Sequence, residues 1–179
     1  MRADFDSAIG ALILFIMSAA IHEAGHCITA IFFGIPMKSL RFLSSGALMT
    51  FDFGRTTYFK EAAVHLGGSL FAISAAVLSY LTVGDAASAF IGMTAVLSAV
   101  NLIPIKGTDG SAVLKAVLMN YLLPDTAEKI TMAVSWISWS ILWCAVVWIE
   151  MRVGANMSLM LFVLGLFFGN IFSDKEKFA

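Results

Sequence analysis

Apolar residues follow one another in long runs along this chain, and short polar links separate the runs. A helix that crosses a bilayer needs about 20 predominantly apolar residues, within a range of about 17–25. Five runs meet this requirement, and they cover residues 7–33, 59–83, 86–103, 130–150 and 155–172. The pattern therefore predicts an all-α integral membrane protein, a five-span bundle of transmembrane helices.

Positive charge is distributed unevenly between the polar links. Nine Lys and Arg residues follow the first, third and fifth runs, whereas only Arg2 and Arg152 lie on the opposite side. Lys and Arg concentrate in the cytoplasmic loops of membrane proteins. We therefore expect the N-terminus outside and the C-terminus in the cytosol.

Two of the cytosolic links contain signals of local structure. Residues 38–53 carry strand-forming residues on both sides of the turn signal Ser44-Ser45-Gly46, which predicts a small β-hairpin at the inner membrane face. Residues 105–125 contain the helix breakers Gly107, Gly110 and Pro124. The stretch 111–123 between these breakers predicts a short helix.

The composition supports a membrane protein and excludes several other classes. Hydrophobic residues make up 60% of the chain and charged residues 13%, against about 45–50% and about 25% in soluble domains. Such a chain is neither disordered nor an ordinary soluble domain. Its net charge of -1 provides no basic surface for a polyanion. We expect the lipid bilayer as a partner and no nucleic acid.

The motif His22-Glu23-Ala24-Gly25-His26 interrupts the first apolar run. Residues four apart lie on one face of a helix, about 6 Å apart along its axis, so His22 and His26 can bind one Zn²⁺ ion. Glu23 leans toward the same ion, where it can accept a proton from water, and Gly25 leaves room beside the metal. Soluble helices contain this pattern by chance, but ionisable groups within a membrane span are costly unless they share a partner. The motif therefore predicts a metal site.

A catalytic zinc site usually has three protein ligands, so one more is required. Asp85 lies at the outer end of its run, and topology excludes it. Four candidates remain near the inner face: Asp52, Glu61, His65 and Asp109.

Asp109 and His65 are the strongest of these candidates. Asp109 follows a stretch broken by Pro104 and Gly107, so a loop can turn its carboxylate back toward the metal; alternatively it caps the helix that starts near Ser111. His65 lies at a similar depth, and we expect it to hydrogen-bond within the bundle or line a cavity rather than bind the metal.

The His22-Glu23-Ala24-Gly25-His26 motif, followed by Asn101-Leu-Ile-Pro104 and Asp109-Gly110, resembles the site-2 protease family of zinc intramembrane metalloproteases. Within that family the likeness is to the stage IV sporulation protein FB branch. The resemblance implies that His22, His26 and Asp109 bind zinc, that Glu23 is the catalytic acid and base, and that Asn101 lies near the substrate. It also implies a single membrane protease domain over residues 1–179, with a catalytic core at about 7–111 and accessory spans at about 127–173.

The chain departs from the family pattern at two positions. The stretch Leu66-Gly67-Gly68-Ser69-Leu70 resembles the family's Gly-Pro element, but Ser69 stands in place of the usual Pro. Ser111 stands in place of the second Gly after Asp109. Neither change removes a ligand implied by the resemblance.

The expected function is cleavage of a membrane-embedded or membrane-associated protein by a zinc endopeptidase. The resemblance suggests a multi-pass protein of the bacterial cytoplasmic membrane, membrane regulators, and a sporulation sigma-factor precursor as substrate. Two other functions fit the same residues, a metal-ion transporter and an inactive scaffold. Residues 71–80 and 134–149 carry no acidic, basic or histidine side chain to continue an ion path, and a scaffold would not need Glu23.

Overall fold

The computed structural model describes residues 2–43, 46–54, 56–153 and 164–165. Most of this part of the chain is helical, and one two-stranded sheet accompanies the helices. In chain order the elements are α1 (Arg2–Phe32), β1 (Met37–Leu43), β2 (Gly46–Phe51), α2 (Tyr58–Val83), the 3₁₀ helix η1 (Gly84–Ala87), α3 (Ser88–Leu102), α4 (Asp109–Met119) and α5 (Pro124–Val153).

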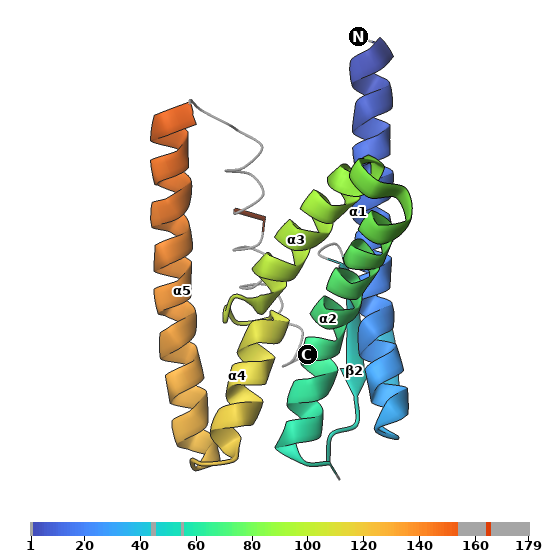
Figure 1. Ribbon diagram of the computed structural model, residues 1–179. Helices are drawn as coiled ribbons and strands as arrows, with labels where there is room; N and C mark the ends of the chain where they lie inside the picture. Colours follow the sequence, from blue (N-terminus) through green and yellow to red (C-terminus); the bar gives the residue numbers. More distant parts are fainter. Residues whose placement is uncertain (1, 44–45, 55, 154–163, 166–179) are drawn as a thin grey trace.

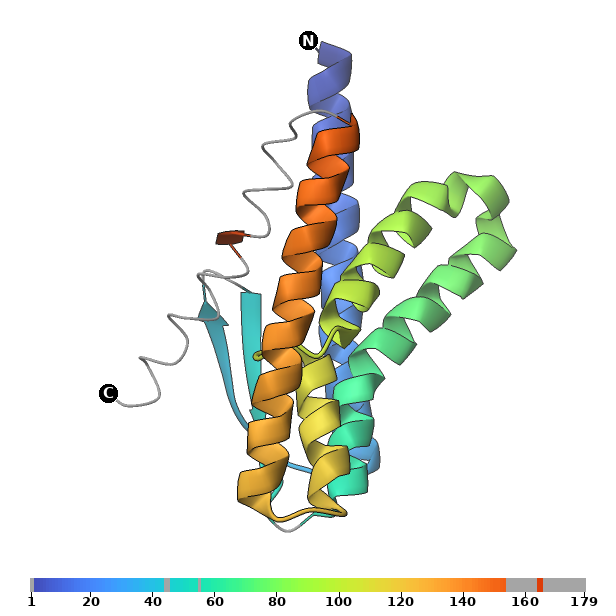
Figure 2. The same ribbon diagram turned by 90° about the vertical axis from the view of Figure 1, so that its left-hand side faces the viewer.

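Three stretches of the described residues are long and apolar enough to cross a membrane: Ile9–Phe32, Tyr58–Leu102 and Pro124–Arg152. They support an integral membrane protein. The second stretch contains two helices, because the chain reverses at η1, where Gly84 has a φ of 61°. Figure 2 shows α2 and α3 as a helical hairpin whose tip leans away from α1.

Four of the five predicted runs correspond to helices α1, α2, α3 and α5. The fifth run, residues 155–172, lies outside the described residues except for 164–165. The number of five spans therefore stays a prediction.

α3 and α4 together form one descending segment that is interrupted halfway (Figure 1). α3 has 15 residues, which extend about 22 Å and fall short of a hydrocarbon core of about 30 Å. Pro104 and Gly107, which has a φ of 93°, separate the two helices. The loop packs on α5: Ile105 is buried with Trp139 and Val146. The backbone break that begins α4 therefore lies within the bundle.

α4 begins two residues before the predicted helix 111–123. The reason is the cap: the Thr108 hydroxyl accepts a hydrogen bond from the Ser111 amide at 3.4 Å, which makes Asp109 the first helical residue. The alternative in which Asp109 caps this helix is therefore wrong. Its carboxylate is available for other contacts.

The predicted β-hairpin is present. β1 and β2 are antiparallel, in a register that pairs Leu40 with Met49 and Leu43 with Gly46; Ser44 and Ser45 of the predicted turn lie outside the described residues. Phe51 at the end of β2 packs in a buried cluster with Ala30 of α1 and Val64 of α2. The hairpin thus lies against the sides of α1 and α2 (Figure 1).

Candidate metal centre

The two histidines of the motif lie one turn apart on α1 and face the same point. Their Nε2 atoms are 3.1 Å apart, and the rings are nearly perpendicular, with an interplanar angle of 81°. His22 is 3% exposed and His26 is 6% exposed. Two buried imidazoles so close together need a shared partner, because a buried polar group without one is costly.

Asp109 provides a third polar atom at this point. Its Oδ2 lies 3.0 Å from His22 Nε2 and 3.2 Å from His26 Nε2. Among the described residues, these three form the group of side chains that could hold a metal ion. Three atoms that bind one tetrahedral ion at about 2.0–2.2 Å lie about 3.3–3.6 Å from one another, so the observed triangle is only slightly tighter than a zinc site.

The hydrogen bond that His26 makes through Nδ1 leaves its other ring nitrogen, Nε2, free to bind a metal. His26 Nδ1 donates to the backbone carbonyl of Val64 on α2 at 2.8 Å. The proton is therefore on Nδ1, and the Nε2 lone pair faces the group. A bond from the remote ring nitrogen to a carbonyl is the usual support of a metal-binding imidazole. The donor set of two imidazoles and one carboxylate matches catalytic zinc chemistry.

Glycines let α1 and α2 approach closely around this group. A Cβ built on Gly25 would lie 2.6 Å from the carbonyl oxygen of Gly67, and one built on Gly68 would lie 2.8 Å from His22 Nε2. The backbone of α2 therefore fills the space beside Gly25, which we had expected to leave room for the metal. Small residues at the crossing of two membrane helices are typical of such close packing.

Glu23 is half-buried and follows His22 directly on α1. Its position three residues before His26 places it on the adjoining part of the same helix face. The next residue, Ala24, is exposed. The predicted acid and base therefore lies on the helix face next to the two histidines.

Asn101 lies in the last turn of α3, and its side-chain amide donates to the Leu97 carbonyl at 3.1 Å. The side chain is half-buried. It precedes the backbone break that leads to Asp109. A role near the substrate stays a prediction.

The other candidate ligands lie outside the triad. Asp52 is paired with Lys38 Nζ at 3.0 Å and is exposed at the hairpin. Glu61 lies in the first turn of α2, and Asp85 lies at its far end in η1. His65 is hydrogen-bonded within the bundle, as we expected: its Nδ1 lies 3.2 Å from Asp109 Oδ1.

Sequence reasoning did not identify the carbonyl of Val64 or the cap at Thr108 as parts of the site. A backbone carbonyl has no signature in the residue types, so no pattern could have indicated Val64. The cap had a signal, because Thr is a favoured capping residue and Thr108 directly precedes Asp109.

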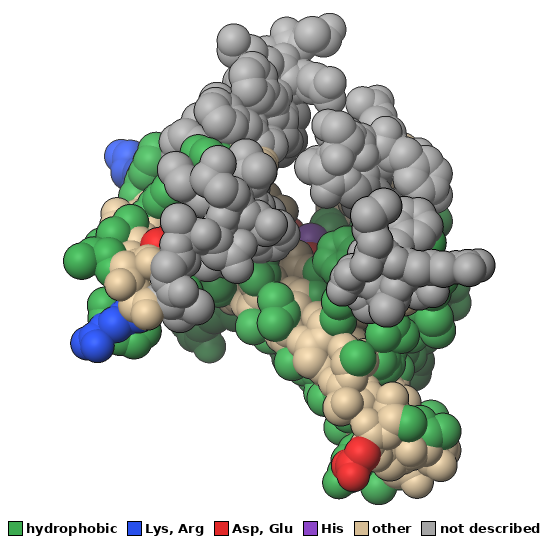
Figure 3. All heavy atoms as spheres, turned by 90° about the horizontal axis from the view of Figure 1, so that it is seen from above, with side chains coloured by type: hydrophobic (Ala, Val, Ile, Leu, Met, Phe, Trp, Pro, Cys, Tyr) green, Lys and Arg blue, Asp and Glu red, His purple; other side chains and the backbone are tan. Residues whose placement is uncertain are grey.

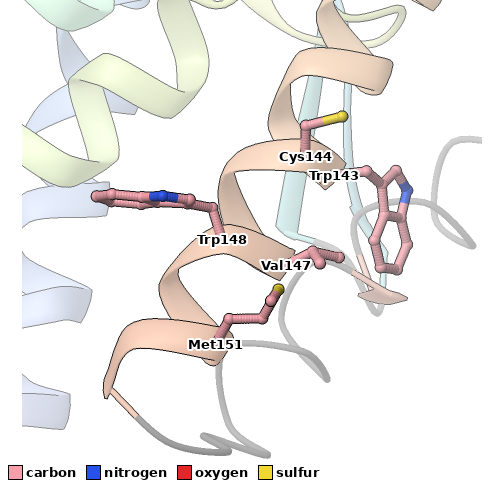
Figure 4. A pocket seen from close by; sticks show the side chains of 5 residues that line it. All are labelled: Trp143, Cys144, Val147, Trp148 and Met151. Carbon is pink, nitrogen blue, oxygen red and sulfur yellow. The ribbon is translucent and has the colours of Figure 1, made fainter.

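Figure 3 views the molecule from the end at which α1 begins, and a histidine side chain is visible deep between the helices. A red acidic side chain lies beside it, and green hydrophobic side chains lie on one side of it. A separate apolar pocket of about 320 Å³ lies on α5 (Figure 4). Among the described residues its lining comes from α5, and none of the candidate metal ligands contributes to it. The lining residues are Trp143, Cys144, Val147, Trp148 and Met151.

No protein-family model matches the chain, and no curated protein matches it. Among solved structures, the chain is similar to the site-2 protease from Methanocaldococcus jannaschii, with a TM-score of 0.62 and 20% sequence identity. The similarity covers 88% of this chain and 74% of that protein. At this identity the likeness concerns the fold, and it extends through most of the described helices. The chain therefore has the fold of a site-2 protease.

Proposed function

We propose that this chain is a zinc-dependent intramembrane endopeptidase that cleaves a membrane-embedded or membrane-associated protein. The observation that carries the proposal is the triangle of His22 Nε2, His26 Nε2 and Asp109 Oδ2 beside Glu23. All four side chains lie within a bundle that has the fold of an intramembrane protease.

His22, His26 and Asp109 would hold the zinc ion. When bound, zinc polarises the scissile carbonyl and favours deprotonation of the attacking water. The three ligand atoms come from one rigid helix and from the first turn of α4. A catalytic zinc site with three protein ligands keeps one further position for water and substrate.

Glu23 would act first as the general base and then as the general acid. Its carboxylate accepts a proton from the attacking water and later donates it to the nitrogen of the departing amine. The Val64 carbonyl holds His26 in the tautomer whose Nε2 faces the proposed zinc position. Asn101, in the last turn of α3, would contact the substrate near the break.

The distribution of polar groups supports proteolysis over ion transport. In the described helices, the potential ligands gather at one level, between α1, α2 and the start of α4. Residues 134–149 of α5 and 71–80 of α2 provide no acidic, basic or histidine side chain beyond that level. A transport path needs a succession of such groups across the bilayer.

The finer features of the proposal rest on sequence. We propose a multi-pass orientation with the N-terminus outside, on the basis of the Lys and Arg distribution. The stage IV sporulation protein FB branch, a bacterial cytoplasmic membrane, membrane regulators and a sigma-factor precursor as substrate rest on the motif resemblance alone.

The test compares the membrane proteomes of cells that express the wild-type chain and its Glu23→Gln variant. We expect defined fragments of membrane proteins that appear only with the wild-type chain. The purified wild-type protein should also contain one zinc ion. Identical fragments from both proteins, or a wild-type protein that binds no zinc, would contradict the proposal.

A further inference from the structure

The two oxygens of Asp109 have different partners. Oδ2 faces the Nε2 atoms of His22 and His26, whereas Oδ1 lies 3.2 Å from Nδ1 of His65. We propose that His65 is a positioning residue that occupies Oδ1, so that Asp109 presents Oδ2 alone to the metal. This inference rests on the proposed zinc site and assigns a role to a residue outside the triad.

One turn of α2 supports two ligands from two other helices. The Val64 carbonyl accepts the hydrogen bond of His26 Nδ1, and the next residue, His65, contacts Asp109. His26 belongs to α1 and Asp109 to α4. Residues 64 and 65 therefore fix the relative position of ligands that are 83 residues apart in sequence (from 26 to 109).

The ring of His65 is itself held in place. Its centroid lies 5.7 Å from the ring of Phe53, just after β2, and 6.3 Å from the ring of His26. The side chain is 23% exposed. Because neighbours on two sides restrict its rotation, His65 can direct Nδ1 at one oxygen of Asp109.

The direction of this hydrogen bond follows from the chemistry of the ligand. A carboxylate that binds a metal is ionised and can only accept hydrogen bonds. His65 Nδ1 is therefore the donor and Asp109 Oδ1 the acceptor.

The consequence concerns the number of coordination positions. A carboxylate with two free oxygens can bind a metal through both, and it then occupies a position that a catalytic site leaves to water and substrate. A hydrogen-bond donor that occupies Oδ1 disfavours a bond between Oδ1 and the metal. His65 would thereby keep the centre open.

Three substitutions distinguish this role from a general contribution to folding. His65→Asn retains a side-chain nitrogen near the place of Nδ1, His65→Gln retains one near the place of Nε2, and His65→Ala retains neither. The full chain is purified in detergent, and Co²⁺ is used as the probe in place of zinc. The visible absorption of bound Co²⁺ is strong in four-coordinate sites and weakens as the coordination number rises.

We expect His65→Ala and His65→Gln to bind metal about 10–100-fold more weakly, with a weaker cobalt absorption, and His65→Asn to restore both properties. Glu61→Gln, one turn earlier on α2, serves as the control and should match the wild type. Circular dichroism and gel filtration establish that each variant is folded. If the alanine variant misfolds, the metal affinity and cobalt absorption of His65→Asn and His65→Gln still test whether a donor at the place of Nδ1 is required.

A cobalt spectrum and an affinity that do not change in His65→Ala or His65→Gln would overturn this role. Complete loss of metal in every His65 variant, as expected for Asp109→Ala, would instead make His65 a ligand and would also overturn it. In both cases the wild-type protein still binds zinc and cleaves, so the proposed function stands. A wild-type protein that binds no metal would refute both.

Discussion

The backbone of Gly68 on α2 lies against the imidazole of His22 on α1, so that a Cβ at Gly68 would come within 2.8 Å of Nε2. The same Cβ would contact Nε2 and Cε1 of His26 even more closely. The site therefore depends on a residue without a side chain. An added methyl group would have to push apart two helices or turn both imidazoles.

Gly68→Ala should abolish or strongly reduce zinc binding. The substitution favours the helix by about 1 kcal/mol, so a loss of metal would come from the displaced imidazoles and not from a weaker helix. Zinc content measured by atomic spectroscopy checks this. Gly92→Ala on α3 is the matched control, because a Cβ there meets no atom within 4 Å; retention of zinc in both variants would contradict the close packing.

Glu23→Gln should keep its zinc and lose its proteolytic activity. The amide has nearly the shape of the carboxylate but cannot accept the proton, and general-base catalysis contributes about 10²–10⁴-fold. A cleavage assay and a metal analysis on the same sample measure both effects. Cleavage near the wild-type rate would remove Glu23 from the mechanism.

Asp109→Ala should lower the zinc content sharply, because it removes one of three ligands. Asp52→Ala is a suitable comparison, since Asp52 is exposed and paired with Lys38 at the hairpin. Its zinc content should equal that of the wild type. If Asp52→Ala lost its zinc and Asp109→Ala kept it, the third ligand would be Asp52 and not Asp109.

The outer edge of β2 offers a way to hold an unwound substrate. The Asp52 amide donates to the Pro36 carbonyl, on the β1 side. Because amides alternate along a strand, those of Met49 and Phe51 point away from β1. A substrate in extended form could pair with this edge by strand addition.

Met49→Pro should therefore reduce cleavage while the zinc content stays unchanged, because proline removes an outward amide donor. Met49→Leu controls for the side chain, which contacts Cys27. Both variants are assayed for zinc and for cleavage. Equal activity of Met49→Pro and Met49→Leu would exclude strand pairing at this position.

The sequence predicted those parts of the molecule that depend on local periodicity. The spacing of His22 and His26 is a property of one helix, and the hairpin follows from alternation around one turn. Both are present in the structure. The four helices that match apolar runs belong to the same class of prediction.

The third member of the triad could not be chosen from local patterns. Asp109 and His65 both lie at the right depth, and the choice depends on how the break after α3 turns α4 toward α1. That turn is fixed by tertiary contacts, such as the hydrogen bond from the Lys106 amide to Ser135 on α5 at 2.6 Å. The role of Gly25 was misjudged for the same reason, since only the approach of α2 shows what fills the space beside it.

Because of the break between α3 and α4, a metal ion bound at the proposed site would act as a cross-link. Two ligands belong to α1, while the third lies at the start of α4, which packs mainly on α2 and α5. An ion bound by all three ligands would join α1 directly to α4, whereas the packing between these two helices otherwise runs mainly through α2. Binding to the folded state alone adds about 2.7 kcal/mol at a free-metal concentration 100 times the Kd. Chelation should therefore loosen α4 from the bundle and lower the melting temperature. Metal supply would then govern the lifetime of the protein as well as the proposed activity.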